Sequence, residues 1–264
     1  MTNPTTNEKL ASSLSAETTN LIPHLPYLLQ DFWELGAAPS AIIDLTEAYI
    51  DLDETTKVLD LACGKGAVSI KLAQALELKV KGIDILPEFI KTANQKAKEH
   101  HVEDLCNFKV GDINEAVTTE KGYDLTILGA VSGVLGTPEE TLKKLKATIK
   151  RGGYIIIDEA YLKEGITQSD INDNISQYLT ETQWLELFKK TGLNLVETVL
   201  AEDIEDENFD SETAMGYLTT RANELIEKYP DKKEMFEGYL KSQQNEYDDL
   251  DTNLVGVMWI LHRG

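Results

Sequence analysis

The stretch Val58-Leu-Asp-Leu-Ala-Cys-Gly-Lys-Gly66 decides the fold of this chain, because it joins an apolar run to a glycine-rich turn. Residues 56–62 are typical of a buried strand, and residues 67–76 place apolar side chains on one helical face. Glycines in the turn let a ligand approach the backbone closely, and the following helix begins with unpaired N–H groups. The pattern predicts a ligand at the carboxyl end of this first strand.

Strands and helices alternate on the C-terminal side of the turn, with short connections between them. Pro87 and the capping box at Thr137 each start a helix, and Gly152-Gly153 ends the second of these. We expect six further strands, at residues 79–85, 107–113, 123–130, 154–158, 193–201 and 254–262. Because the central strands are apolar along their length, this α/β sheet is expected to be parallel and covered by helices on both faces.

Helical additions are expected at both ends of the α/β core. Residues 1–55 are predicted to form an N-terminal helical cap, of which residues 1–20 are frayed. Residues 56–201 are predicted as the cofactor-binding core, 202–253 as a helical insertion or lid, and 254–264 as the last strand of the sheet. We expect these segments to form one domain.

The charge of the chain argues against several classes of partner. Its 264 residues include 46 acidic and 25 basic side chains, and the formal net charge is −21. This balance disfavours nucleic acid and anionic membranes as partners, and it attracts small cations. The acidic stretch from Glu202 to Glu212 lacks the spacing of a calcium loop, so a solvated loop is expected there.

Targeting and metal-binding signals are missing from the sequence. The N-terminal residues lack a secretory leader, and the apolar run at residues 125–136 is too short to span a bilayer. The two cysteines cannot form a disulfide framework, and no metal-ligand spacing is found. We therefore expect a cytoplasmic protein that holds no metal.

Three aspartates occupy the carboxyl ends of the first three expected strands. Asp60 begins the glycine turn, Asp84 ends the second strand and Asp112 ends the third. Carboxylates in these places can accept hydrogen bonds from an ammonium group, from ribose hydroxyls and from the exocyclic amine of adenine. Each aspartate alone could equally be a helix cap or a turn former. Together with the glycine turn, they favour a ligand with ribose, adenine and positive charge.

A dinucleotide is the alternative ligand of such a sheet. Its fingerprint needs a third glycine after Gly64 and Gly66, and Ser69 occupies that position. A nicotinamide-dependent oxidoreductase is therefore the less favoured interpretation.

These motifs resemble those of class I S-adenosylmethionine-dependent methyltransferases over residues 58–161. The similar segments are VLDLACGKG from Val58, GID from Gly82, GDI from Gly111, YDLTILGA from Tyr123 and LKATIKRGGYIIIDEAY from Leu145. The C-terminal third resembles the small-molecule branch of that family. The resemblance implies a Rossmann-like fold, with a seven-stranded mixed sheet, helices on both faces and helical lid additions. The sequence departs from the family at Ala62, where the usual turn has its first glycine.

The resemblance also implies a place for each part of the cofactor, S-adenosyl-L-methionine. The methionine part would lie against turn residues and against the end of the fourth strand, namely Asp60, Ala62, Gly64, Gly66, Gly129 and Ala130. The ribose would bind Asp84. The adenine would lie among Ile85, Asp112 and Ile113.

Residues for the acceptor are expected where the carboxyl edge of the sheet meets the helical additions. Glu159 could hold a cationic amine or accept a proton, and Tyr161 could orient an acceptor through its hydroxyl group. Tyr27 and Trp33 could place aromatic faces against a positive charge. The structural alternatives are an exposed glutamate at a strand end, a core tyrosine and the apolar face of the cap.

The sequence thus predicts a methyltransferase that transfers a methyl group to a small-molecule acceptor by in-line displacement. Such a reaction depends mainly on positioning and on exclusion of water. The alternatives are a non-catalytic S-adenosylmethionine-binding regulatory protein and, less favoured, the oxidoreductase. The sequence leaves open the identity of the acceptor, the atom that is methylated and the oligomeric state.

Overall fold

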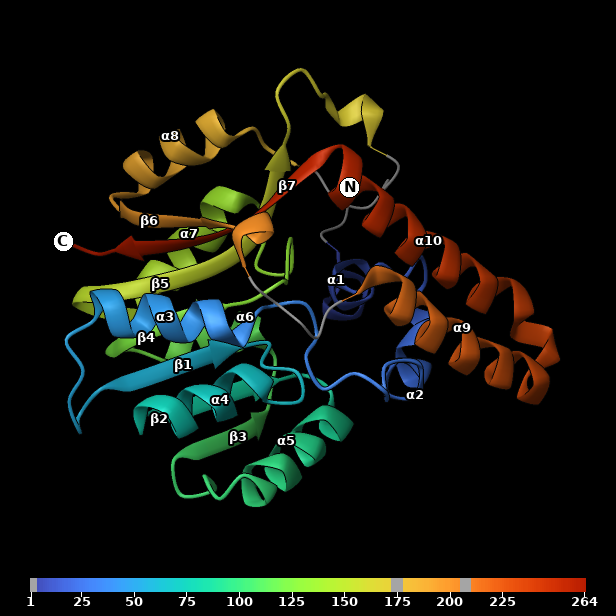
Figure 1. Ribbon diagram of the computed structural model, residues 1–264, viewed down its shortest axis with the longest axis horizontal. Coiled ribbons are helices and arrows are strands. Elements are labelled where there is room, and N and C mark those ends of the chain that lie inside the picture. The colour runs from blue at the N-terminus through green and yellow to red at the C-terminus, as the bar shows by residue number, and fades with distance from the viewer. Residues whose placement is uncertain (1–3, 172–177, 205–209) are drawn as a thin grey trace.

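The computed structural model describes residues 4–171, 178–204 and 210–264. A seven-stranded sheet in the order β3-β2-β1-β4-β5-β7-β6 runs through the molecule (Figure 1). The strands are β1 (Lys57–Leu61), β2 (Lys79–Asp84), β3 (Cys106–Val110), β4 (Tyr123–Leu128), β5 (Ile149–Leu162), β6 (Asn194–Leu200) and β7 (Leu254–His262). β7 runs antiparallel to β5 and β6, whereas the pairs among β1 to β5 are parallel.

Both faces of the sheet are buried, because the central strands carry apolar side chains at successive positions. In β5, Ile155 and Ile157 pack into one hydrophobic cluster, and Ile156 packs into the cluster on the opposite face. Successive strand residues point to opposite faces, so this apolar run requires cover on both sides. The predicted α/β class and the mixed seven-stranded sheet are confirmed.

Helices of the described residues cover both faces of the sheet (Figure 1). On one face lie α3 (Pro39–Tyr49), α4 (Ala67–Leu76) and α5 (Pro87–Glu99); on the other lie α6 (Ile113–Thr119), α7 (Pro138–Thr148) and α8 (Glu181–Thr191). The capping boxes at Thr137 and Thr180 are formed, since each threonine side chain accepts the N–H group three residues on.

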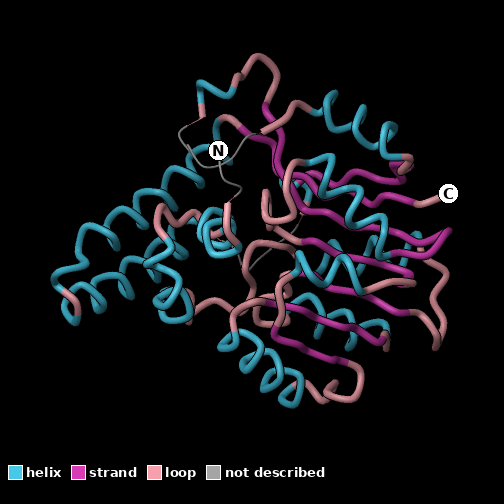
Figure 2. The backbone as a smooth tube through the Cα atoms, turned by 180° about the vertical axis from the view of Figure 1, so that it is seen from behind, coloured by secondary structure: helices cyan, strands magenta, loops and turns pink. Residues whose placement is uncertain are grey.

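A separate helical group stands at the carboxyl ends of the parallel strands, as Figure 2 shows beside the sheet. It consists of α1 (Thr6–Ser13), α2 (Leu25–Leu28), α9 (Ser211–Lys228) and α10 (Lys233–Thr252). These helices share one hydrophobic cluster, to which Leu21, Leu218 and Phe236 contribute. Segments from the two ends of the chain therefore fold together into one lid.

Several element boundaries differ from the sequence predictions. Residues 6–13 form a helix where fraying was expected, because Thr5 and Glu8 make a capping box. Helix α6 was not predicted, and Asp112 caps it. Strand β5 is longer than the predicted 154–158, since its pairing with β7 continues as far as Leu162.

Part of the acidic stretch that was expected to be a solvated loop, residues 205–209, lies outside the described residues. Among the residues that the structure does describe, no helix is both long and apolar enough to cross a membrane.

Candidate cofactor and acceptor site

The glycine turn between β1 and α4 adopts a backbone shape that few residue types allow. Ala62, Gly64 and Gly66 have φ values of 56°, 54° and 78°. A Cβ atom on Gly66 would lie 2.7 Å from the Phe108 ring and 2.9 Å from Cβ of Ala93, so no side chain fits there. At Ala62 the left-handed conformation costs about 1 kcal/mol, which explains why glycine is usual at this position in the resembling family.

The first two predicted cofactor carboxylates hold this turn in place. Asp60 is buried and accepts a hydrogen bond from Oγ of Ser69 at 2.6 Å. Burial raises the pKa of Asp60 to about 7, with a smaller contribution from Asp84. Asp84 accepts the backbone N–H of Gly64 at 2.9 Å and that of Leu86 at 2.8 Å. Its carboxylate has further lone pairs for ligand hydroxyls.

The third carboxylate, Asp112, joins the sheet to the N-terminal helix. It caps α6 through the N–H of Asn114 at 2.8 Å, and it accepts a hydrogen bond from the Thr6 hydroxyl at 2.9 Å. Burial acts to raise the pKa of Asp112, but these hydrogen bonds outweigh it and the pKa is lowered. Ile85 packs against the lid cluster and Ile113 against the sheet. Because β1, β2 and β3 are neighbours, the three aspartates share one edge of the sheet.

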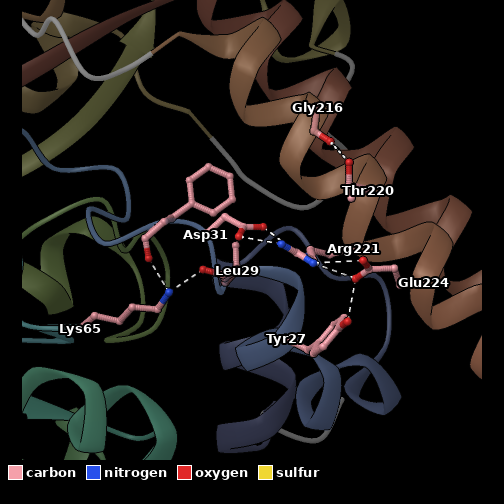
Figure 3. Close-up of polar contacts among 9 residues, drawn as sticks. Tyr27, Leu29, Asp31, Lys65, Gly216, Thr220, Arg221 and Glu224 are labelled. Carbon is pink, nitrogen blue, oxygen red and sulfur yellow. Dashed lines mark hydrogen bonds and ion pairs between the residues drawn. The ribbon is translucent and has the colours of Figure 1, made fainter. Parts of the chain in front are cut away.

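The segment of residues 29–38 lies across the glycine turn (Figure 3). Nζ of Lys65, a residue of the turn, donates hydrogen bonds to the carbonyl groups of Leu29 and Phe32. Burial lowers the pKa of Lys65 to about 8. A Cβ atom on Gly64 would lie 3.0 Å from Leu35, so the segment is in close contact with the turn.

The lid helix α9 holds the same segment from its other side (Figure 3). Arg221 donates from Nε to Asp31 at 2.6 Å, and it also pairs with Glu224 at 3.0 Å. Glu224 accepts the hydroxyl of Tyr27 at 2.6 Å. A continuous set of polar contacts therefore links α9, the N-terminal segment and the glycine turn.

The two aromatic residues predicted for the lid lie in different places. Trp33 donates from Nε1 to the carbonyl of Lys65 at 3.2 Å and stacks on His100, with ring centroids 4.9 Å apart. Tyr27 is 40% exposed and lies at the surface, where its hydroxyl group bonds to Glu224. Trp33 is therefore beside the cofactor turn, whereas Tyr27 does not line the main cavity.

That main cavity, of about 470 Å³, lies between the carboxyl ends of β4 and β5 and the lid. Its wall includes Ala130 after β4, Glu159 on β5 and Tyr239 on α10. Tyr161 does not line this cavity. Its ring stacks on Trp259, with centroids 6.1 Å apart, and packs against the hydrophobic cluster on the face covered by α6, α7 and α8. The structure thus brings Glu159 and Ala130 to one cavity and gives Tyr161 a packing role.

Glu159 accepts a hydrogen bond from Oγ of Ser132 at 2.6 Å, and its neighbour Asp158 also lines the cavity. Burial raises the pKa of each of these carboxyl groups to about 7. Sequence reasoning missed Asp158, Ser132 and Tyr239. The sequence did contain a signal for Asp158, because it forms an adjacent acidic pair with Glu159 after an apolar run. The other two come from a loop and from the lid, for which the sequence offered no motif.

The residues at the carboxyl edge fit S-adenosylmethionine in their chemistry. Asp84 and Asp112 offer acceptors for hydroxyl and amine groups. The glycines of the turn present backbone without side chains at the carboxyl edge of the sheet. A Cβ atom on Gly129 would lie 2.7 Å from Cβ of Ala37, so a side chain there would fill this cradle. The space between the turn and Leu35 is about 40 Å³, so residues 29–38 pack closely against the turn.

Comparisons with known proteins identify the family of this chain. The chain matches the methyltransferase-domain family over residues 52–212. The uncharacterised protein YjhP of Escherichia coli strain K12 is 30% identical over 183 residues, which cover 67% of this chain and 71% of that protein. A ribosomal protein L11 methyltransferase of Dictyoglomus turgidum is 28% identical over 170 residues, which cover 64% of this chain and 48% of that protein.

The fold is also found among solved structures. An S-adenosylmethionine-dependent methyltransferase from Geobacter sulfurreducens, in complex with S-adenosylhomocysteine, superposes with a TM-score of 0.73 at 21% identity. The superposition covers 91% of this chain and 97% of that one. The chain therefore belongs to the methyltransferase-domain family and is an S-adenosylmethionine-dependent methyltransferase with the Rossmann-like class I fold.

Proposed function

We propose that this enzyme transfers the methyl group of S-adenosylmethionine to a small-molecule acceptor in the cavity beside Ala130. The observation that carries the proposal is the cavity itself, of about 470 Å³, which lies between the sheet edge and the lid. Pockets for small ligands typically measure about 300–1,000 Å³. The cavity therefore suits a small acceptor better than a polymer.

The residues at the carboxyl edge divide the cofactor among them. Asp84 would hold the ribose, and Asp112 would hold the adenine together with Ile85 and Ile113. The methionine part would lie along the turn, against Asp60, Ala62, Gly64, Gly66 and Gly129. When bound, the cofactor supplies a methyl group on a positively charged sulfur atom.

The protein itself contributes to the reaction by positioning the two reactants and by excluding water from them. An acceptor held by the lid helices and by β5 would face the cofactor turn across Ala130, which borders the cavity. Positioning of two reactants supplies much of the rate enhancement in a direct displacement, and closure of a lid excludes water. Glu159 is the group placed to bind the acceptor or to take its proton.

A small acceptor is also favoured over nucleic acid by charge. The chain has a formal net charge of −21, and of its arginines Arg221 is already paired with Asp31 and Glu224. Proteins that bind nucleic acid need lysine and arginine side chains to neutralise phosphates. A ribosomal RNA acceptor is therefore disfavoured.

Calorimetric titration tests the cofactor. We expect S-adenosylmethionine and S-adenosylhomocysteine to bind in the micromolar range and NAD not to bind. Incubation with methyl-labelled donor and a fractionated metabolite extract then tests transfer, with label expected in a low-molecular-weight product. Binding without any labelled product would support the non-catalytic regulatory alternative, and binding of NAD alone would contradict the proposal.

A further inference from the structure

The wall of the main cavity carries acidic side chains from several elements. Asp158 and Glu159 come from β5, Glu34 from the N-terminal segment and Glu246 from α10. Within residues 4–171, 178–204 and 210–264, no lysine, arginine or histidine lines this cavity. A cleft lined by charges of one sign concentrates its field, because the surrounding walls have a low dielectric constant. The cavity is therefore strongly attractive to a cation.

Two of these acidic groups are already occupied. Glu34 forms an ion pair with Lys71, and Glu246 accepts hydrogen bonds from Ser15 at 2.5 Å and from Gln243 at 3.1 Å. Lys71 of α4 neutralises Glu34, and the contacts of Glu246 hold it to Ser15 and Gln243. The groups available to a ligand are therefore on the sheet.

The adjacent carboxyl groups of β5 lack a positively charged partner. Among the contacts of the described residues, the side chain of Asp158 makes no hydrogen bond or ion pair, and Glu159 has the Ser132 hydroxyl as its hydrogen-bond donor. Burial raises the pKa of each to about 7. The two carboxylates line the same cavity and repel one another electrostatically, and a cation in the cavity reduces that cost.

An independent observation comes from the lid, at Tyr239 of α10. This side chain is only 2% exposed, yet it lines the cavity and makes no hydrogen bond with the residues that the structure describes. Burial raises its pKa far above the usual range, so the hydroxyl stays neutral. A neutral hydroxyl group in the cavity wall that is not already hydrogen-bonded can serve a ligand as donor or acceptor. The ring of Phe32 on the same wall adds an aromatic surface.

We propose that the acceptor is an organic amine that enters as a cation and binds with its nitrogen against Asp158 and Glu159 of β5 and the hydroxyl of Tyr239. This inference rests on the proposed function, because it names the substrate class of the same cavity. An acidic acceptor would meet uncompensated carboxylates and would be repelled.

The same arrangement accounts for the proton of the amine. A protonated nitrogen has no free electron pair, so one N–H bond must break before transfer, and the Glu159 carboxylate takes that proton. The nitrogen then uses the released pair to bond to the methyl carbon. As the carbon–sulfur bond breaks, its electron pair stays on sulfur, which becomes a neutral thioether. The methylated nitrogen carries the positive charge, and Glu159 passes its proton to water.

A trio of probes with one skeleton tests the charge requirement. Phenethylamine, 2-phenylethanol and phenylacetate are each titrated calorimetrically into the protein saturated with S-adenosylhomocysteine. We expect phenethylamine to bind about tenfold or more tightly than the alcohol, which corresponds to about 1.4 kcal/mol, and phenylacetate to bind weakest. Equal or tighter binding of phenylacetate would overturn the proposal.

Matched variants locate the binding groups. Asp158→Asn and Glu159→Gln should each weaken phenethylamine about tenfold, while Glu47→Gln on the exposed surface of α3 removes the same charge without effect. Binding of S-adenosylhomocysteine should be unchanged in all three, and none should melt below the wild-type protein. Unaltered amine affinity in both cavity variants would refute the assignment. Failure of the wild-type protein to bind S-adenosylhomocysteine would instead refute the proposed function.

Discussion

At the scale of single residues, Asp84 has a structural task and a proposed ligand task at once. Its two carboxylate oxygens accept the N–H groups of Gly64 and Leu86, so it fixes the glycine turn against the start of α5. Asp60 likewise combines a structural task with a proposed ligand task, since it accepts a hydrogen bond from Ser69 of α4. In both cases the sequence indicated an acidic residue at a strand end and left open whether it binds a ligand or forms the turn.

Replacement of Asp84 by alanine should weaken the binding of S-adenosylhomocysteine by about 1–3 kcal/mol, because charge-assisted hydrogen bonds are lost. Calorimetric titration measures the change. The control is Asp124→Ala, which removes a carboxylate that accepts a backbone N–H, that of Lys57 at 2.8 Å, at the opposite edge of the sheet. That variant should keep its cofactor affinity. Equal affinities in wild type and Asp84→Ala would contradict the placement of the ribose.

At the scale of elements, the N-terminal segment of residues 29–38 connects the lid to the cofactor turn. Lys65 holds its backbone carbonyl groups, and Arg221 of α9 holds Asp31 (Figure 3). The segment has no regular secondary structure between α2 and α3, and its position depends on these side chains. Side-chain contacts on both sides therefore tie this segment to the glycine turn and to α9.

Replacement of Lys65 by methionine should loosen this segment, because the carbonyl groups of Leu29 and Phe32 lose a charged donor. The aliphatic part of the side chain still packs as before. We expect a loss of about 1–3 kcal/mol in the free energy of unfolding. Hydrogen exchange of amides in residues 29–38 should become faster. Lys79→Met, at an exposed position of β2, is the control and should leave exchange unchanged. Unaltered exchange in Lys65→Met would show that other contacts hold the segment.

At the scale of the whole molecule, the chain combines a large negative charge with buried carboxyl groups that resist ionisation. The formal net charge is −21, and burial raises the pKa of Asp60, Asp158 and Glu159 to about 7 in the folded protein. In the unfolded chain the pKa of such carboxyl groups is about 4. Between these values the folded state binds more protons than the unfolded state, so its stability falls as the pH rises.

We therefore expect the melting temperature to decrease from about pH 5.5 to about pH 8, as these groups are forced to ionise in place. Added salt should raise the melting temperature at the higher pH, since it screens repulsion among surface charges. Differential scanning calorimetry at two ionic strengths measures both effects. The double variant Asp158→Asn/Glu159→Gln should show a smaller pH dependence. A melting temperature that rises over this range would contradict the raised pKa values.

The sequence by itself determined the sheet and the glycine turn at its carboxyl edge. Apolar runs such as the one around Ile156 require cover on both faces, and Gly66 is needed where any side chain would strike Phe108. These requirements are local, so a pattern of a few residues in the sequence is enough to indicate them. Capping boxes such as that at Thr137 marked helix starts for the same reason.

Only the tertiary structure decided the main cavity, which we propose holds the acceptor. Its wall combines β5, the loop after β4 and lid helices from both ends of the chain, so no spacing in the sequence joins Ser132, Glu159 and Tyr239. The same applies to Tyr27 and Tyr161, whose aromatic character was compatible with a site or with packing. Long-range contacts with Glu224 and Trp259 placed them outside the cavity. Packing between distant segments fixes such positions, and that information is absent from local residue patterns.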